Sequence, residues 1–298
     1  MSPAIRTTSL TKRYRRLNAL ANLDLEVHEG AIYALVGPNG AGKTTTIKIL
    51  MNIVRATSGR AEILGTDSTR IAGKAFANIG YVSENQDQPE WMTVSALMAY
   101  LRPFYPKWDR QLEDVLIKQL NLPLDRKISQ LSRGMKMKVA LASSLAYHPS
   151  LIVLDEPFGG LDPLVRDQLI EAFLERAAES TLFISSHDLA EIESFASHIG
   201  FLDQGKLRFS EEMSTLLDRF REVEVTVDSS ASLPAALPPT WLQTKSSAGV
   251  VRFVETSFDR ERTSSEIATH FGAVRDISFQ PMTLRAIFLA MAKSNTDA

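Results

Sequence analysis

Residues 37–44 have the types and the spacing of a loop that binds phosphate groups. They read GPNGAGKT and match the pattern G-x-x-x-x-G-K-[ST], after the apolar stretch AIYALV and before a predicted helix over 44–54. The glycines let the backbone wrap phosphates, Lys43 can reach the β- and γ-phosphates, and the Thr44 hydroxyl suits Mg²⁺. The expected nucleotide contacts are Gly37, Pro38, Asn39, Gly40, Ala41, Gly42, Lys43, Thr44 and Thr45.

Two adjacent carboxylates, Asp155 and Glu156, follow the apolar run LIVL at 151–154. Such a run is typical of a strand buried on both faces, and α/β proteins bind ligands at the carboxyl ends of their strands. Asp155 would hold Mg²⁺, and Glu156 would orient or deprotonate an attacking water. A solvated acidic strand end is the alternative, which the neighbouring phosphate-binding loop disfavours.

His187 ends another apolar run, TLFISSH at 181–187. A lone histidine is more often a surface or core residue than a catalyst. Its place at the end of a core strand favours a donor that touches the γ-phosphate. We therefore expect three catalytic residues, Lys43, Glu156 and His187, and two metal ligands from these motifs, Thr44 and Asp155.

A second anion site is predicted at residues 131–142, LSRGMKMKVALA. Ser132 is a favourable N-cap, and the residues after it are strong helix formers interrupted only by Val139. A helix start with free N–H groups, a hydroxyl and nearby cations attracts anions. The chain thus has two candidate phosphate sites.

Alternating strand and helix patterns must position these residues. Up to about residue 210 they predict an α/β core with a mixed sheet and a helical insertion over about 88–147. Residues 23–30 and 31–37 are expected to form a hairpin-like strand pair, and 199–207 a terminal hairpin with a Gln-Gly turn. Further strands are expected at 78–83, 151–157 and 181–187, and helices at 94–100, 110–120, 135–147, 163–179 and 189–196.

The pattern changes after Phe220. Strands are expected at 222–228, 249–255 and 273–279, and helices at 263–271 and 283–293, with Thr263 and Glu266 as a capping box. This predicts a small α+β, ferredoxin-like domain over 221–298, joined through the Pro-rich segment 233–240, beside a core domain over 1–220. An accessory structural module is the favoured role for it, and a regulatory sensor is the alternative.

Composition excludes several classes of protein. The 298 residues include 35 acidic and 33 basic ones, which argues against a nucleic-acid-binding chain, so no nucleic-acid partner is expected. The absence of cysteine excludes disulfides and thiolate chemistry, and the five histidines lack metal-ligand spacing. No run reaches the roughly 18 apolar residues of a spanning helix, so we expect that the chain neither enters nor crosses a membrane.

The order of five motifs, residues 37–44, LSRGM, LIVLDEP, GGLD and SSH, resembles the ATP-binding subunit of ABC transporters over roughly residues 4–210. The resemblance implies a P-loop NTPase core of ABC type that hydrolyses ATP with Mg²⁺. It implies that Tyr14 stacks on adenine, that Ser132 and Gly134 belong to the signature loop, that Asp162 follows the catalytic strand, and that His187 is the switch histidine. Tyr14 could equally pack locally.

The resemblance also implies partners. Two subunits, identical or different, pair head to tail, so that Ser132 of each contacts the ATP held by the other. Separate integral membrane permease subunits complete the transporter, which places the chain at the cytoplasmic face of the membrane. Residues 89–93, which include Trp91, are the candidate surface for the permease.

The sequence departs from the family pattern in two places. Arg133 and Met135 replace signature residues, and Arg133 would contact the nucleotide or point into solvent. Glu84 stands where a glutamine usually links Mg²⁺ to the membrane partner, and it would be a ligand of the metal and the nucleotide. With residues 104–109, FYPKWD, these features resemble bacterial exporters of the antibiotic-resistance and lipid or polysaccharide type.

Two other functions compete with transport. A soluble ABC ATPase acting on ribosomes or nucleic acid is the first, but such relatives usually carry two of these domains or a long coiled coil. A GTPase or kinase is the second. It is disfavoured because no guanine-reading Asn-Lys-x-Asp stretch follows the core motifs in this sequence.

Overall fold

The computed structural model describes residues 3–83, 86–177, 179–227 and 237–294. Contacts divide the chain into two compact units. The first comprises Met1–Asp188 with Phe195–Ser210, and the second comprises Leu189–Ser194 with Glu211–Ala298. Each is described by itself.

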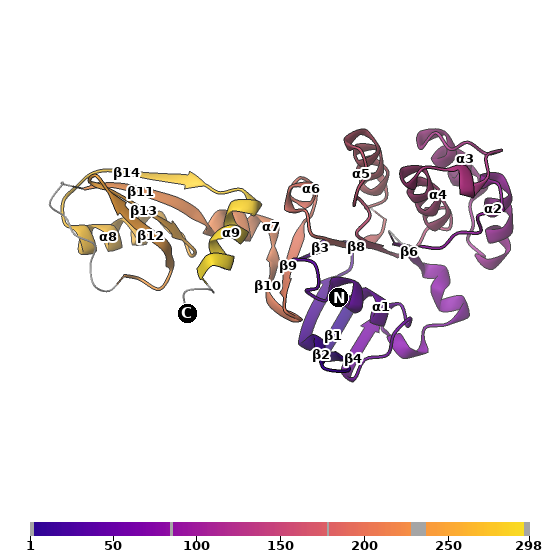
Figure 1. The fold of residues 1–298 in the computed structure, drawn as a ribbon, viewed down its shortest axis with the longest axis horizontal. Helices are drawn as coiled ribbons and strands as arrows, with labels where there is room; N and C mark the ends of the chain where they lie inside the picture. Colours follow the sequence, from indigo (N-terminus) through magenta and orange to yellow (C-terminus); the bar gives the residue numbers. More distant parts are fainter. Residues whose placement is uncertain (1–2, 84–85, 178, 228–236, 295–298) are drawn as a thin grey trace. The chain divides into compact units, whose positions relative to one another are not determined.

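The first unit contains two sheets (Figure 1). An antiparallel sheet has the order β2-β1-β4-β5, from β1 (Pro3–Tyr14), β2 (Leu17–His28), β4 (Ser58–Ile63) and β5 (Thr66–Asp67). A six-stranded sheet has the order β10-β9-β3-β8-β7-β6. Its strands are β3 (Ile32–Val36), β6 (Ile79–Ser83), β7 (Leu151–Asp155), β8 (Thr181–Ser186), β9 (His198–Asp203) and β10 (Lys206–Glu212).

Parallel pairing brings the predicted site strands together. β3 pairs with β8 and β9, and β7 pairs with β6 and β8, all in parallel. The carboxyl ends of these strands therefore share one edge of the sheet. The two-residue turn Gln204–Gly205, with both φ angles positive, joins β9 to β10 as expected, and this hairpin makes the sheet mixed.

The prediction that residues 23–30 and 31–37 pair as a hairpin is wrong. β2 pairs with β1, whereas β3 enters the other sheet between β8 and β9. The alternation of β2 gives it one buried face, while β3 is buried almost throughout, and these patterns suit different sheets.

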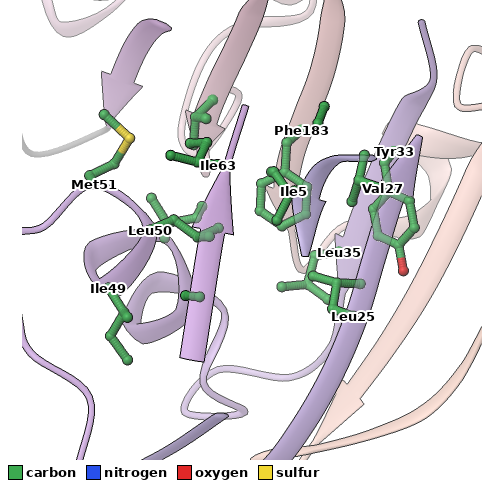
Figure 2. Close-up of a cluster of buried hydrophobic side chains, with 14 of the residues drawn as sticks. Ile5, Leu25, Val27, Tyr33, Leu35, Ile49, Leu50, Met51, Ile63 and Phe183 are labelled. Atoms are coloured by element: carbon green, nitrogen blue, oxygen red, sulfur yellow. The ribbon is translucent and has the colours of Figure 1, made fainter. Parts of the chain in front are cut away.

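The main core of the first unit lies among both sheets and α1 (Lys43–Leu50). Figure 2 shows Ile5 of β1, Val27 of β2, Leu35 of β3 and Phe183 of β8 in this cluster, near Leu50 of α1. Because α1 packs in this core, the loop before it is held at the sheet edge.

The first unit contains further helical elements besides α1. They are the 3₁₀ turns η1 (Ser68–Arg70), η2 (Gly73–Asn78), η3 (Arg102–Phe104) and η4 (Ile128–Gln130), and the α-helices α2 (Val94–Leu101), α3 (Arg110–Gln119), α4 (Arg133–Leu145) and α5 (Pro163–Ala177). α4 packs against β6, α2 and α3. The predicted helical insertion and mixed sheet are confirmed.

The second unit contains the antiparallel sheet β12-β13-β11-β14. Its strands are β11 (Arg221–Val227), β12 (Trp241–Ser247), β13 (Val250–Glu255) and β14 (Val274–Pro281), and its helices are α6 (Leu189–Glu193), α7 (Met213–Arg219), α8 (Arg260–Phe271) and α9 (Leu284–Ser294). β11 lies between β13 and β14, antiparallel to both, and α8 connects those two strands. This is the split β-α-β arrangement of ferredoxin-like folds.

Three expectations for this unit need correction. α8 begins earlier, and Asp259 caps it by accepting from the Arg262 N–H, so Thr263 and Glu266 form no capping box. β12 was not predicted, because its alternation is broken by a shift in the pairing register between Leu242 and Lys245. Residues 237–240 lie in the sequence between β11 and β12 rather than before the unit, and residues 233–236 lie outside the described part.

Candidate functional site

The phosphate-binding loop follows β3 and turns into α1 at Lys43. The Lys43 Nζ donates to the backbone oxygens of Gly37 at 2.7 Å and Pro38 at 3.3 Å, and the side chain is almost fully buried. Gly42 has a φ of 113°, and a methyl group there would lie 2.5 Å from the Ala19 oxygen. Glycine is therefore required at position 42.

Asp155 lies at the end of β7, next to the loop. Its Oδ1 accepts from the Thr44 hydroxyl at 3.0 Å and from the Ser185 hydroxyl at 2.7 Å. Burial raises the pKa of Asp155, and the two hydroxyl donors oppose that rise. Oxygen donors of this kind are those that Mg²⁺ prefers, so Thr44 and Asp155 would suit a Mg²⁺ ion.

Glu156 connects two predicted catalytic residues. Its Oε1 lies 3.1 Å from the Lys43 Nζ, and its Oε2 lies 2.7 Å from the His187 Nδ1. Its backbone N–H donates to Ser185 at the hydroxyl and the carbonyl. The φ of 51° turns the chain sharply after β7 and places the carboxylate between the two partners.

Five predicted residues, Lys43, Thr44, Asp155, Glu156 and His187, therefore meet at one sheet edge. Glu156 is mostly buried and His187 is half-exposed. A carboxylate between a cation and an imidazole can accept a proton from water, while the cation and the loop N–H groups can hold an oxyanion. This chemistry is suited to the transfer of a phosphoryl group to water.

Ser185 belongs to the site, although it was not predicted. It is fully buried in β8 and contacts both Asp155 and Glu156. The signal in the sequence is a pair of serines that interrupts an apolar strand one residue before His187. A buried hydroxyl needs a partner, which here is the carboxylate.

Ser132 and Gly134 lie at the start of α4. The Ser132 hydroxyl accepts from the Met135 N–H at 3.3 Å and caps the helix as predicted. A methyl group on Gly134 would lie 3.3 Å from Val165 of α5, and one on Gly160 would lie 3.0 Å from the Arg133 guanidinium. Arg133 is exposed, and its guanidinium lies against the loop after Glu156.

The other predicted residues lie on separate elements. The Asp162 Oδ1 accepts from the Val165 N–H at 3.0 Å at the start of α5. Tyr14 ends β1 with 42% of its surface exposed, and the Lys12 Nζ lies 4.7 Å from its ring centroid. Glu84 lies outside the described residues.

Comparison with known proteins agrees with the motif order. The family described as ABC transporter matches residues 20–159. A bacitracin transport ATP-binding protein of Bacillus licheniformis is 34% identical over 216 residues, which are 70% of this chain and 69% of the relative. A daunorubicin resistance ATP-binding protein of Streptomyces coeruleorubidus is 34% identical over 209 residues, which are 68% of this chain and 65% of the relative.

A solved structure agrees with the fold. A structure of an ATP-binding subunit of an ABC transporter has a TM-score of 0.66 and 26% identity, and the match covers 72% of this chain and 92% of that one. The α/β core with a mixed sheet and helices is therefore that of an ATP-binding cassette.

Proposed function

The chain belongs to the ATP-binding subunits of ABC transporters, which bind and hydrolyse ATP, and we propose that two copies power export through a separate membrane permease. The observation that carries the proposal is the meeting of Lys43, Glu156 and His187 beside the Thr44–Asp155 pair. In this arrangement each of these five side chains has a partner that fixes its direction.

Each residue has a role in this proposal. Lys43 and the loop glycines hold the β- and γ-phosphates, and Thr44 and Asp155 hold Mg²⁺, which neutralises phosphate charge when bound. Glu156 takes the proton of the attacking water, and His187 orients Glu156 and touches the γ-phosphate. Tyr14 stacks on adenine, which its exposed ring allows.

The second anion site completes the first in a dimer. Ser132 begins α4, exposed and close in sequence to Arg133, and its helix start suits a phosphate. Because ATP held by the loop of one copy needs a cap on its open side, Ser132 and Gly134 of the partner supply that cap. Hydrolysis then requires two subunits.

Family membership supports binding to a separate membrane permease. Within the described residues, no helix has the length and apolarity to span a membrane. By its family, the chain would act at the cytoplasmic face, bound to membrane-spanning partners. Relatives named for bacitracin transport and daunorubicin resistance support export of an antibiotic-like compound. The permease selects that compound.

Isolation of the complex tests this function. A tagged Glu156→Gln chain is expressed in its native host, membranes are solubilised in mild detergent with MgATP, and copurifying proteins are identified by mass spectrometry. A stoichiometric multi-spanning protein is the expected result. Ribosomal proteins without a membrane partner would contradict it and favour the soluble ATPase.

A Lys43→Ala chain is the control for the nucleotide. It removes the cation that reaches the phosphates, so it should lose ATP binding while its fold is retained. Retained ATP binding at wild-type affinity would contradict the role of the loop.

A further inference from the structure

The ring of Tyr14 carries a lysine against one of its faces. Lys12 and Tyr14 lie two residues apart at the end of β1, inside the first unit. The Lys12 Nζ lies over the Tyr14 ring, 4.7 Å from its centroid. A cation within about 6 Å of a ring centroid is attracted by the negative face of the ring. One face of this ring is therefore covered by a residue of the same strand.

A second contact holds the Lys12 ammonium in this place. The Nζ donates to the Arg55 backbone oxygen at 2.8 Å. Arg55 lies in the segment after α1, and this segment is fixed because the N–H groups of residues 53 and 54 donate to the Lys48 oxygen at 2.8 and 3.1 Å. Lys12 therefore connects the Tyr14 ring to the chain that continues from the phosphate-binding loop and α1.

The backbone on both sides of Lys12 is held without the lysine side chain. The Thr57 N–H donates to the Thr11 oxygen at 2.8 Å, and the Arg13 N–H donates to the Thr57 hydroxyl at 3.0 Å. These contacts fix the position of the strand. What the Lys12 side chain adds is therefore an orientation for the Tyr14 ring.

Tyr14 keeps surface for a ligand beside the lysine. The residue is 42% exposed, although one face of its ring lies under the Lys12 ammonium. Nucleotide bases stack on the faces of aromatic side chains. A ring that is already fixed in one orientation loses less conformational freedom when a ligand binds to it. The arrangement is therefore suited to one base on the open face of the ring.

We propose that Lys12 is a positioning residue for the nucleotide base: it covers one face of the Tyr14 ring and fixes the ring so that the other face stacks on adenine. This inference deepens the proposed function and rests on the role of Tyr14 in it. Lys12 thus raises nucleotide affinity through the base, whereas Lys43 and the loop glycines act on the phosphates.

Calorimetric titration of the full chain with ADP and with pyrophosphate, both in the presence of Mg²⁺, tests the proposal because only ADP contains the base. Lys12→Met removes the charge and should weaken ADP binding about 2- to 5-fold, as for an exposed cation over an aromatic ring. Pyrophosphate binding should remain as in wild type. Lys12→Arg keeps a cation and should restore ADP binding. Arg16→Met, in the turn between β1 and β2, is the control for lost charge and should bind ADP as wild type does.

Tyr14→Ala separates this proposal from the proposed function. Loss of the stacking ring should weaken ADP binding about 5- to 150-fold, and Lys12→Met added to it should cause no further loss. A further loss in that double variant, or an equal loss of pyrophosphate binding in Lys12→Met, would show that the ammonium acts on phosphate charge and would overturn the proposal.

The two single variants also distinguish which inference fails. Wild-type ADP affinity in Lys12→Met together with a loss in Tyr14→Ala would overturn the role of Lys12 and leave the stacking role of Tyr14 intact. Wild-type ADP affinity in Tyr14→Ala would refute the stacking role itself, and the role of Lys12 with it.

Discussion

At the level of single residues, Glu156 adopts a conformation that its neighbours must hold. A left-handed φ costs a non-glycine residue about 1–2 kcal/mol. Two hydrogen bonds from its N–H to Ser185, and contacts of its carboxylate with Lys43 and His187, offset that cost. Strain maintained in this way is typical of a catalytic position.

Glu156→Gln tests the role of this carboxylate. An amide cannot take a proton from water, so kcat should fall at least about 100-fold. ATP affinity should not weaken, because the neutral side chain competes less with phosphate for Lys43. ATPase assays, nucleotide titration and size-exclusion chromatography should show an ATP-bound dimer without turnover.

Glu171→Gln is the matched control for that substitution. Glu171 lies exposed on α5, so its amide variant should retain wild-type kcat. Hydrolysis by Glu156→Gln at the wild-type rate would show that another group is the base.

The site residues that could be predicted from the sequence carry a charge or lie in a pattern that needs an unusual backbone conformation. Glu156 follows an apolar strand and Lys43 stands in a glycine-rich pattern, so both were identified. Ser185 was missed because serine is common and its role depends on Asp155, which is distant in sequence and adjacent only through β7–β8 pairing. The contact of Arg133 with Gly160 was missed for the same reason.

At the level of elements, Ser132 has two functions that can be separated. Its hydroxyl caps α4, and we propose that it also touches the phosphate held by the partner. Ser132→Ala should lose the cap, at about 1 kcal/mol, as well as activity. Ser132→Asp keeps a cap but adds a charge that repels phosphate, so its thermal midpoint should stay near wild type while ATPase activity is lost.

Thermal unfolding and ATPase assays on both variants give the measurement. Wild-type hydrolysis in Ser132→Asp would remove the proposed phosphate contact and leave only the cap.

A buried ion pair ties η3 to α3 in the helical part. The Glu113 carboxylate accepts from Arg102 at 2.6 and 2.8 Å and from the Trp108 indole at 2.7 Å. Burial alone would raise the pKa of Glu113, but these donors outweigh it and lower the pKa. The folded state thus binds fewer protons than the unfolded chain, so the stability that Glu113 adds is present above its ordinary pKa and is lost as pH falls through the lowered value.

Glu113→Gln should therefore destabilise the fold in a pH-dependent way. At neutral pH we expect a loss of about 1.5–3 kcal/mol, as for hydrogen bonds to charged groups. The difference from wild type should shrink on acidification. Denaturant unfolding at several pH values measures it, and a loss of equal size at acid pH would contradict the assigned cause.

Element types were predictable where periodicity was strong. β7 and β8 contain continuous apolar runs and are buried throughout, and α4 has a clear N-cap, so they form at the expected places. Strand pairing was not predictable in the same way, because β2 and β3 are neighbours in sequence but belong to different sheets. Which strands pair with one another depends on the face that each strand buries. The local sequence shows that face only in part.

At the level of the whole molecule, family membership predicts a surface that binds the permease. This surface is not part of the nucleotide site. Trp91 is 72% exposed, while the backbone around it is held on both sides. The Ser129 N–H donates to the Glu90 oxygen at 3.1 Å, and the Ile128 N–H donates to the Met92 oxygen at 2.9 Å. A large apolar ring presented by fixed backbone is suited to binding a partner helix.

Trp91→Ala should weaken assembly without affecting nucleotide binding. Removal of an exposed anchor of this size typically costs an interface about 2 kcal/mol or more, which is roughly a 30-fold loss of affinity. Copurification of the permease with the tagged chain should fall accordingly, while ATP titration remains as in wild type. Phe104→Ala, which removes another ring that is 62% exposed, is the control and should retain the permease. Equal recovery of the permease with both variants would exclude residues 89–93 as the docking surface.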